Sequence, residues 1–312
     1  MMFKNSFKLL LANFSSVWKL LLYKIIVVAV VFGLFMLATP ALSNLLNVEQ
    51  LSDSVASFLT NFGFGISYID LLTYLYTILQ TVINVLSEMI ATSPLLFLYL
   101  VFLLFILLPF LWHFSDVAIG ECAYGFMASQ TKYGFMGAMI RKLGVSVSYS
   151  ILLTLAILPF TALMLAGGVA VLYLTVYGGL LLYFLPFILF VYLLLINSLK
   201  ITMLSGWTPS IVVFNCNAVT GFNKGMTALF RRFFKVWSTS IILTFIVLSV
   251  AMLLGCYALL IIIPIASLFI SIFGMVMFFG SQGMRYYVDM DTIITPKKLE
   301  QTDKICKLKY VI

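Results

Sequence analysis

Three titratable side chains, His113, Asp116 and Glu121, lie close together in the sequence and are the best candidates for chemistry. His113 and Asp116 are three residues apart, so they would share one face of a helix. An imidazole combined with carboxylates is a ligand set typical of zinc or iron. His113 is the only histidine, so a metal site would take its other ligands from carboxylates. The alternative, which we favour, is that these polar residues end a helix, with Asp116 contacting Arg141 or Lys142. We therefore assign no metal and no cofactor.

The hydroxyl residues also lack a catalytic context. Ser146, Ser150 and Thr154 recur every four residues, but a serine nucleophile needs a nearby base, and none is within reach. Small polar stripes of this kind more often mediate helix packing. No GxSxG, HExxH, Walker or Rossmann signature is present. The sequence therefore predicts a protein that is not an enzyme.

The composition places these residues in a membrane protein. The chain has 312 residues, of which 63% are hydrophobic and 9% are charged, whereas soluble domains carry about 25% charged residues. Continuous apolar runs of about twenty residues are typical of transmembrane helices. The sequence predicts an all-α polytopic membrane protein with six spans, at Ile25–Leu42, Pro94–Trp112, Leu143–Leu165, Gly179–Ser198, Ser238–Cys256 and Leu260–Gly280.

The charged residues predict how the spans are oriented. All eighteen lysines and arginines lie before span one, between spans two and three, between spans four and five, or after span six. The segment between spans one and two carries only acidic charges, such as Glu49 and Asp70. Cations are retained on the cytoplasmic side, so we expect a cell-membrane protein with both termini in the cytoplasm. No Asp, Glu, Lys or Arg falls in the middle of a predicted span.

The sequence contains an internal repeat. Met136–Thr154 and Met226–Thr244 share Met, Ala, Arg, Ser, Ser, Ile, Leu and Thr in one register, and each carries a pair of cations. A third copy opens the chain when Trp18 is aligned with Trp237. Each copy is a basic segment that runs into a span, which predicts three helical hairpins in parallel orientation.

The predicted domain is a single six-span unit over residues 1–284, followed by a polar cytoplasmic tail over 285–312. Hairpin one carries an extracytoplasmic insertion at 45–93, where apolar residues from Ile69 to Ile90 recur at helical spacing. This insertion is either a lid or a docking surface. Short turns are expected at Ala166-Gly167-Gly168 and at Cys256-Tyr257, and Pro109 and Pro186 should kink spans two and four.

The cytoplasmic loop at 199–237 predicts a basic amphipathic elbow helix. One helical face would combine Phe222, Met226, Leu229, Phe230, Phe233 and Val236. The simpler interpretation is a helix lying at the lipid headgroups; the alternative is a basic pocket for an anionic lipid head. Nucleic acid is excluded, because no groove-reading element accompanies the charge. The cations predicted to contact anionic headgroups are Arg141, Lys142, Lys224, Arg231, Arg232 and Lys235.

This loop also resembles a known group of proteins. The matching residues are Pro209, Ile211-Val212-Val213, Gly221, Ala228-Leu229, Arg231-Arg232, Phe233 and Trp237. The pattern is similar to that of loosely related bacterial six-span membrane proteins, which include the membrane domain found ahead of the catalytic domain in some glycerophosphodiester phosphodiesterases. The resemblance implies a membrane module, and we do not expect the phosphodiesterase activity, because no catalytic domain follows Met284 here.

The sequence thus leads to two functional hypotheses. The first is a non-enzymatic scaffold or subunit that organises lipids or a partner membrane protein. The alternative is a transporter of a neutral or lipid-like substrate. A cavity at the middle of the membrane, lined by Thr154, Tyr183 and Asn197, would favour this hypothesis.

Overall fold

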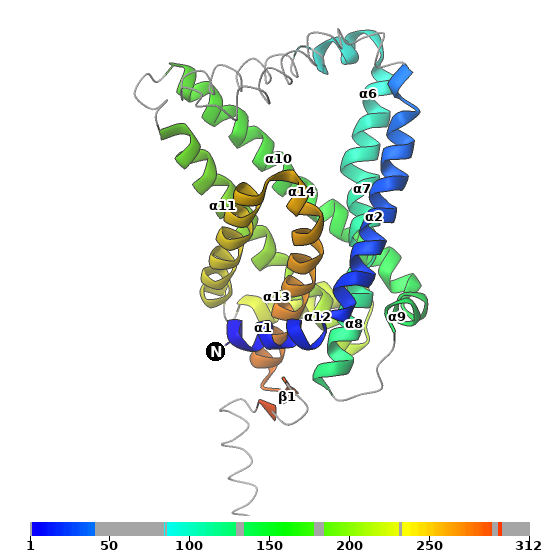
Figure 1. The fold of residues 1–312 in the computed structure, drawn as a ribbon, viewed down its shortest axis with the longest axis vertical. Helices are drawn as coiled ribbons and strands as arrows, with labels where there is room; N and C mark the ends of the chain where they lie inside the picture. The colour runs from blue at the N-terminus through cyan, green and yellow to red at the C-terminus, as the bar shows by residue number, and fades with distance from the viewer. Residues whose placement is uncertain are drawn as a thin grey trace, which may run out of the picture. The chain divides into compact units, whose positions relative to one another are not determined.

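Helices account for nearly all of the described chain. The computed structural model describes residues 2–40, 84, 86–128, 134–177, 184–230, 233–288 and 293–294. The prediction of an all-α protein is confirmed (Figure 1). Within the described residues, the exception is a two-stranded antiparallel ladder in which β1 (Tyr286–Tyr287) pairs with β2 (Ile293–Ile294).

Several helices have the length and composition of membrane spans. In the described part of the chain, five such segments occur, and a sixth results if α13 (Ala218–Phe230) and the start of α14 (Phe233–Gln282), which are bent by 96°, are counted as one span. The five segments are Ser15–Met36, Pro94–Met127, Leu143–Ala170, Phe187–Phe214 and Ile262–Gln282.

The chain divides into two units. The core unit comprises Met1–Ile25 and Phe110–Ile312, and the hairpin unit comprises Ile26–Pro109. In the hairpin unit, residues of α2 (Ser15–Met36) pack against α6 (Pro94–Val101), where the Tyr99 hydroxyl donates a 2.9 Å hydrogen bond to the Leu34 carbonyl. Its small core centres on Ala38 and Met89.

The core unit is built around the second half of α14. Leu268, Phe273 and Met275 are among its fully buried side chains. The helices that pack on α14 include α1 (Met2–Ala12), α8 (Asp116–Met127), α11 (Leu185–Leu204), α12 (Trp207–Phe214) and α13. In the most apolar 18-residue stretch of Ile262–Gln282, 61% of the residues are buried, which makes the last predicted span the centre of this unit.

Helix α14 folds back on itself. Val236 and Met277 line the same small cavity, although a straight helix between them would be about 60 Å long. Figure 1 shows the arch that joins the first limb of α14 (gold) to the second (orange). The two limbs correspond to predicted spans five and six. The sequence predicted a short turn at Cys256-Tyr257, whereas these two residues are part of the continuous helix α14.

The sequence repeat has a common structural form. In each copy a short helix leads into a long one, α1 into α2, α9 (Phe135–Arg141) into α10 (Leu143–Tyr177), and α13 into α14, and the long helices begin within one residue of the same aligned position. Equivalent positions are also buried alike, as for Leu153 and Leu243 and for Ser150 and Ser240. The repeated residues therefore specify a short helix and the packed first turns of a long one.

Two predicted features of the second hairpin are wrong. The turn expected at Ala166-Gly167-Gly168 is helical, because α10 continues to Tyr177. Pro186 does not kink a span, since it lies in the first turn of α11, where its missing N–H costs no hydrogen bond. The Gly178-Gly179 pair lies outside the described residues.

In the second predicted span, the helix changes its pitch. A π-helical turn, η1 (Phe102–Leu107), separates α6 from α7 (Leu108–His113). Pro109 lies two residues after this turn, and its ring obstructs regular α-helical bonding in the preceding turn. A distortion next to Pro109 was expected, and a π turn is the form that it takes.

Burial also alters the prediction for the C-terminal tail. Tyr286 and Val288 are buried in the core unit, and Asn5 Nδ2 donates a 3.1 Å hydrogen bond to the Tyr286 hydroxyl. Burial raises the pKa of Tyr286. The beginning of the predicted solvated tail thus belongs to the folded domain. Most of the predicted outer insertion lies outside the described residues, and residues 86–92 at its end are helical.

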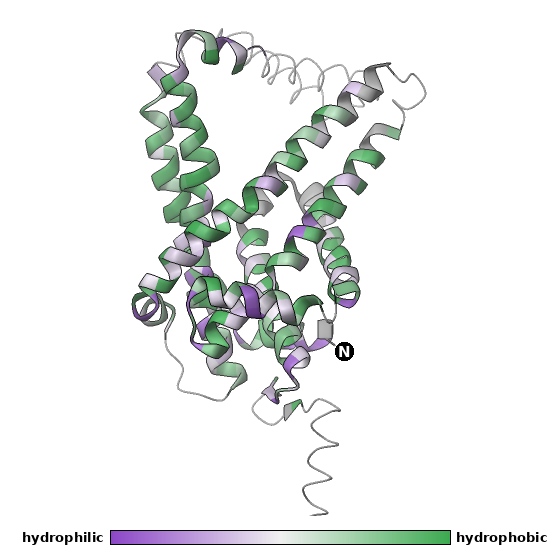
Figure 2. Cartoon of the chain, turned by 180° about the vertical axis from the view of Figure 1, so that it is seen from behind, coloured by the Kyte–Doolittle hydropathy of each residue, from purple (hydrophilic) through white to green (hydrophobic). Residues whose placement is uncertain are grey.

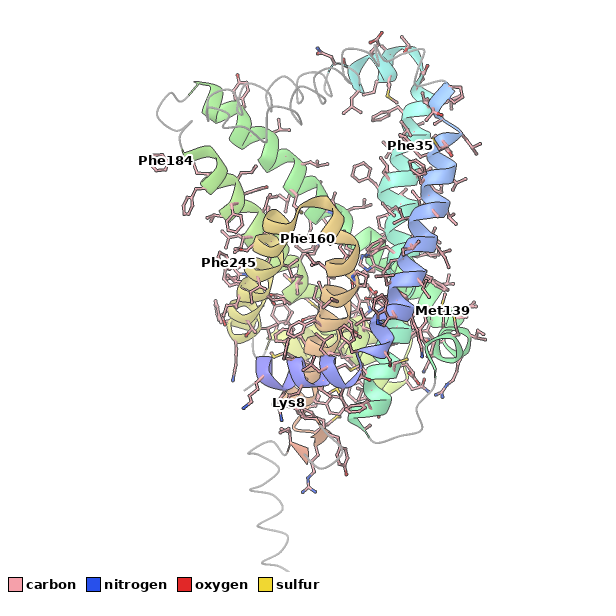
Figure 3. All side chains as sticks on the ribbon, viewed as in Figure 1. Lys8, Phe35, Met139, Phe160, Phe184 and Phe245 are labelled. Carbon is pink, nitrogen blue, oxygen red and sulfur yellow. The ribbon has the colours of Figure 1, made fainter. Side chains whose placement is uncertain are left out.

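Hydropathy separates the long helices from the short ones in the core unit. Helices α10 and α11 are hydrophobic along most of their length, and hydrophilic residues concentrate on the short helices near the N-terminus (Figure 2). Phe184 and Phe245 project outward from the long helices, and Lys8 projects from α1 (Figure 3). Apolar side chains on the outside of a helix are typical of a lipid-facing surface.

Candidate functional site

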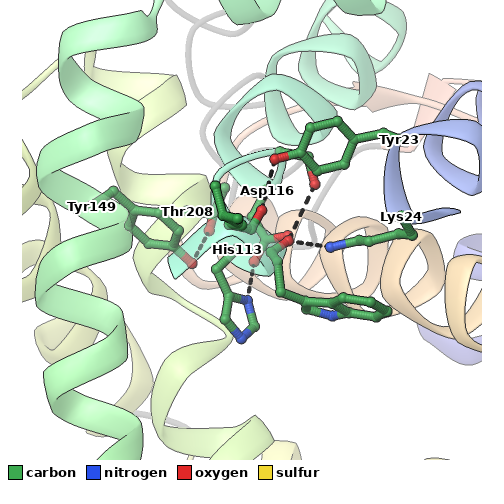
Figure 4. Close-up of polar contacts among 9 residues, drawn as sticks. Tyr23, Lys24, His113, Asp116, Tyr149 and Thr208 are labelled. Carbon is green, nitrogen blue, oxygen red and sulfur yellow. Dashed lines mark hydrogen bonds and ion pairs between the residues drawn. The ribbon is translucent and has the colours of Figure 1, made fainter. Parts of the chain in front are cut away.

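The strongest polar constellation lies at the break between α7 and α8. His113 is in the last turn of α7, and Asp116 is the first residue of α8. The His113 Nδ1 and Asp116 Oδ2 atoms are 2.7 Å apart, as predicted from their spacing (Figure 4). A carboxylate at a helix N-terminus matches the local dipole, and the hydrogen bond to His113 joins the end of α7 to the start of α8. The pair therefore stabilises the break.

Two residues of α2 complete this corner of the core unit. The buried Lys24, 3% exposed, donates its ammonium to the carbonyl oxygen of Trp112 and lies 4.3 Å from the centroid of the indole ring. The Tyr23 hydroxyl donates a 2.7 Å hydrogen bond to the Leu111 carbonyl oxygen. The last carbonyls of a helix lack intrahelical partners, so Tyr23 and Lys24 cap α7 from a neighbouring helix.

A third contact approaches from α10 and α12. The Thr208 hydroxyl donates a 2.9 Å hydrogen bond to the Tyr149 hydroxyl, and both side chains are buried (Figure 4). The Tyr149 ring also meets the Trp207 ring edge-on, with 5.3 Å between the centroids. A close approach of α8 explains this arrangement, since a Cβ at Gly120 would lie 2.8 Å from Thr208 Cγ2.

This corner could orient an imidazole for proton transfer. When Asp116 accepts the Nδ1 proton of neutral His113, the other ring nitrogen becomes the proton acceptor. Orientation of this kind is the role of the carboxylate in acid–base dyads. The same hydrogen bond also has a purely structural role, since it stabilises the junction between α7 and α8.

Glu121 does not join the dyad. It lies five residues after Asp116 and therefore points about 140° away around α8. Its Oε1 is 3.4 Å from Arg141 Nη2, and its Oε2 is 4.0 Å from Lys142 Nζ. The 4.0 Å separation is an ion-pair distance and leaves Oε2 without a hydrogen bond. The sequence paired these two cations with Asp116, whereas the structure pairs them with Glu121, and Asp116 pairs with His113.

The Glu121 cluster connects three segments. Lys142, at the junction of α9 and α10, also donates to the Asn215 side chain. Asn215 ends α12 in the left-handed conformation, with φ 47°. Glu121 and Lys142 are 9% and 7% exposed. Among the described residues, no group of three or more His, Cys, Asp and Glu side chains is placed to hold a metal ion.

The six cations predicted at lipid headgroups fall into different environments. Lys142 is buried against protein groups, and Arg141 is partly exposed beside Glu121. Lys224 and Lys235 are exposed. Arg231 and Arg232 lie outside the described residues.

The elbow region is more deeply packed than the sequence indicated. Helix α12 is buried over most of its length, and the Trp207 indole donates a 2.8 Å hydrogen bond to the Ala218 carbonyl. On the predicted apolar face, Leu229 and Val236 are buried, whereas Phe230 is 64% exposed. The predicted face is therefore divided, with Leu229 and Val236 buried in the protein and Phe230, the last residue of α13, exposed.

Sequence reasoning missed Lys24, Tyr149, Thr208 and Asn215. The predicted first span began at Ile25, whereas α2 begins at Ser15 and includes Lys24. A cation next to an apolar run was the available signal for Lys24. The partners of Tyr149 and Asn215 come from distant segments, so no local pattern reveals them.

Comparison with known proteins finds no match to this chain among family models, curated protein sequences or solved structures.

Proposed function

We propose that the protein is a non-enzymatic membrane scaffold or subunit, which organises lipids or a partner membrane protein. The observation that supports this proposal is the small buried share of four of the five spans in the described chain. In the most apolar 18-residue stretch of Pro94–Met127, 6% of the residues are buried within the chain, and in that of Leu143–Ala170 the share is 11%. Spans that bury so little against each other leave their apolar faces to lipid or to another protein.

The proposed topology follows the charges. Six spans form three parallel hairpins in the cell membrane, with both termini in the cytoplasm. Single-cysteine variants of a protein without native cysteines test this topology in intact cells. With a membrane-impermeant maleimide, Thr92→Cys should react and Gly134→Cys should not. Reaction of Gly134→Cys without prior permeabilisation would overturn the topology.

Native mass spectrometry of the protein, purified gently from its own membrane, tests the scaffold proposal. A second protein at fixed stoichiometry would support it. A photo-crosslinking amino acid at Leu98 then locates the contact, because Leu98 is strongly exposed on α6. The buried Leu103 provides the matched control. A protein that carries neither a partner nor retained lipid would contradict the proposal.

Buried hydroxyls support the alternative of transport. Ser150, Thr154 and Ser240 are buried, and their hydroxyl oxygens have no hydrogen-bond partner among the described residues. An unsatisfied buried hydroxyl costs about 1–3 kcal/mol, which water or a polar group of a substrate would offset. The other predicted lining residues give a mixed result: Asn197 is half-buried, and Tyr183 lies outside the described residues.

Cysteine accessibility separates the two proposals. If the hydroxyl stripe lines a water-filled path, Ser150→Cys should react with a small water-soluble methanethiosulfonate. The lipid-facing Leu155→Cys is the control, because Leu155 is well exposed on the same helix. Failure of Ser150→Cys to react, in a protein that folds normally, would exclude such a path and leave the scaffold proposal.

A further inference from the structure

A surface hollow lies beside α13, where the ends of α12 and α14 meet this helix. Its volume is about 370 Å³, and its lining residues are Phe214, Asn223, Lys224, Thr227, Ala228 and Gln282. These residues include a cation and several uncharged polar side chains, and none is acidic. The hollow is thus suited to an anionic group rather than to a metal ion.

Lys224 is held over an aromatic ring in this hollow. Its Nζ atom lies 4.3 Å from the centroid of the Phe214 ring. Because Phe214 is the last residue of α12, the ammonium lies near the negative end of a helix dipole, where a cation is favoured. These interactions place the ammonium at the hollow without neutralising its charge.

The other polar residues supply hydrogen-bond donors. The side-chain amides of Asn223 and Gln282 each carry two N–H donors, and both residues are exposed. Thr227 uses its hydroxyl proton in a 2.8 Å bond to the Asn223 carbonyl, so its oxygen only accepts. An ammonium combined with two amides matches the oxygens of a phosphate group.

Apolar residues on the same helix face indicate which phosphate compound fits. Val219, Asn223, Thr227 and Phe230 follow one another at intervals of four, four and three residues, so they share one side of α13. Val219 and Phe230, which flank the polar pair, are 61% and 64% exposed. A small soluble phosphate would leave these apolar side chains exposed, whereas the glycerol and acyl groups of a lipid would cover them.

We propose that this hollow binds the phosphate headgroup of an anionic phospholipid. Lys224 provides the charge, Asn223 and Gln282 donate hydrogen bonds, and Val219 and Phe230 contact the acyl region. The inference rests on the proposed lipid-organising function and names the site and the class of lipid. It differs from the elbow pocket expected from the sequence, because it relies on α12 and α14 in addition to α13.

Native mass spectrometry of the full chain in nanodiscs or in mild detergent tests the site. Phosphatidylglycerol is the probe, and phosphatidylcholine is the neutral comparison. Lys224→Gln should lower the retention of phosphatidylglycerol about fivefold, a ratio that corresponds to ~1 kcal/mol. Lys224→Arg should preserve retention, since it keeps the charge. Lys235→Gln, which removes an exposed cation outside the hollow, is the matched control.

Three results would overturn the inference. The first is an equal loss of lipid in Lys224→Gln and Lys235→Gln, which would indicate a diffuse electrostatic attraction. The second is displacement of the lipid by millimolar inorganic phosphate, which would identify a free-phosphate site. The third is unchanged retention in Lys224→Gln. Unchanged retention would reject the site at Lys224 only. The scaffold proposal would still hold if lipid binds elsewhere or a partner protein co-purifies, so failure of the site and failure of the scaffold proposal can be distinguished.

Discussion

Gly206 and Gly225 pack backbone against backbone where α12 begins. A Cβ atom at Gly225 would lie 2.6 Å from the carbonyl oxygen of Gly206, and one at Gly206 would lie 2.9 Å from that of Gly225. Gly274 of α14 is similarly close, since its Cβ would lie 2.4 Å from the Ser205 carbonyl oxygen. Three segments thus meet at distances that no other residue type permits.

Alanine at this crossing should therefore destabilise the core unit. We expect Gly225→Ala to cost about 1–3 kcal/mol, the usual cost of overpacking. Gly137→Ala is the control, because Gly137 lies in a helix with nothing near its missing Cβ, and alanine there should gain up to ~1 kcal/mol. Thermal unfolding in detergent, followed by tryptophan fluorescence, measures both. Equal melting temperatures would show that the crossing relaxes freely.

The Glu121 carboxylate should be needed for the Lys142 cation to stay buried. Glu121→Gln removes the carboxylate that faces Lys142 and leaves the Asn215 side chain as its hydrogen-bond acceptor, so we expect a loss of about 1–3 kcal/mol. The partial exposure of Arg141 keeps the loss below that of a fully buried pair. The control Glu88→Gln removes an exposed carboxylate.

A double substitution sharpens this test. The double variant Glu121→Gln/Lys142→Met removes both buried charges. Its free energy of unfolding should therefore recover towards that of the original protein. Additive losses in unfolding experiments would mean that the two residues act independently. The cluster would then have no role as an ion pair.

Lys24 should contribute to stability through the Trp112 carbonyl and ring. We expect Lys24→Met to cost about 1–3 kcal/mol, because the Trp112 carbonyl at the end of α7 loses its ammonium donor and keeps only a 3.5 Å bond from the Ser115 hydroxyl. Lys19→Met removes an exposed cation five residues earlier in α2 and should stay within about 0.5 kcal/mol of the original protein. Unfolding midpoints in detergent compare the two. A Lys19→Met variant as unstable as Lys24→Met would argue for an effect of net charge.

Trp207 should be sensitive to loss of its indole N–H. In Trp207→Phe, the Ala218 carbonyl loses its 2.8 Å donor and the smaller ring leaves a void, so we expect a cost of about 1–3 kcal/mol. Trp18→Phe is the control, since Trp18 is largely exposed, and it should change the melting temperature little. If both variants melt alike, the buried hydrogen bond contributes no net stability.

Composition alone determined the class of this protein. Long apolar runs have few stable solutions other than helices that face lipid, so the helical spans were predictable. The repeat from Met136 and Met226 predicted that each copy leads into a long helix, and α10 and α14 begin within these copies. The i, i+3 spacing was sufficient to pair His113 with Asp116, because helical geometry fixes that relationship locally.

Only the tertiary structure decided the partners of buried polar groups. Lys24 reaches Trp112 and Lys142 reaches Asn215 through helices that are distant in sequence. The helical ends of α10 and α11 also differ from the predicted ones, since hydropathy does not distinguish a helix that ends from one that continues. Side-chain pairing depends on how helices cross, and that is fixed by close packing at positions such as Gly120 and Gly274 rather than by any local pattern.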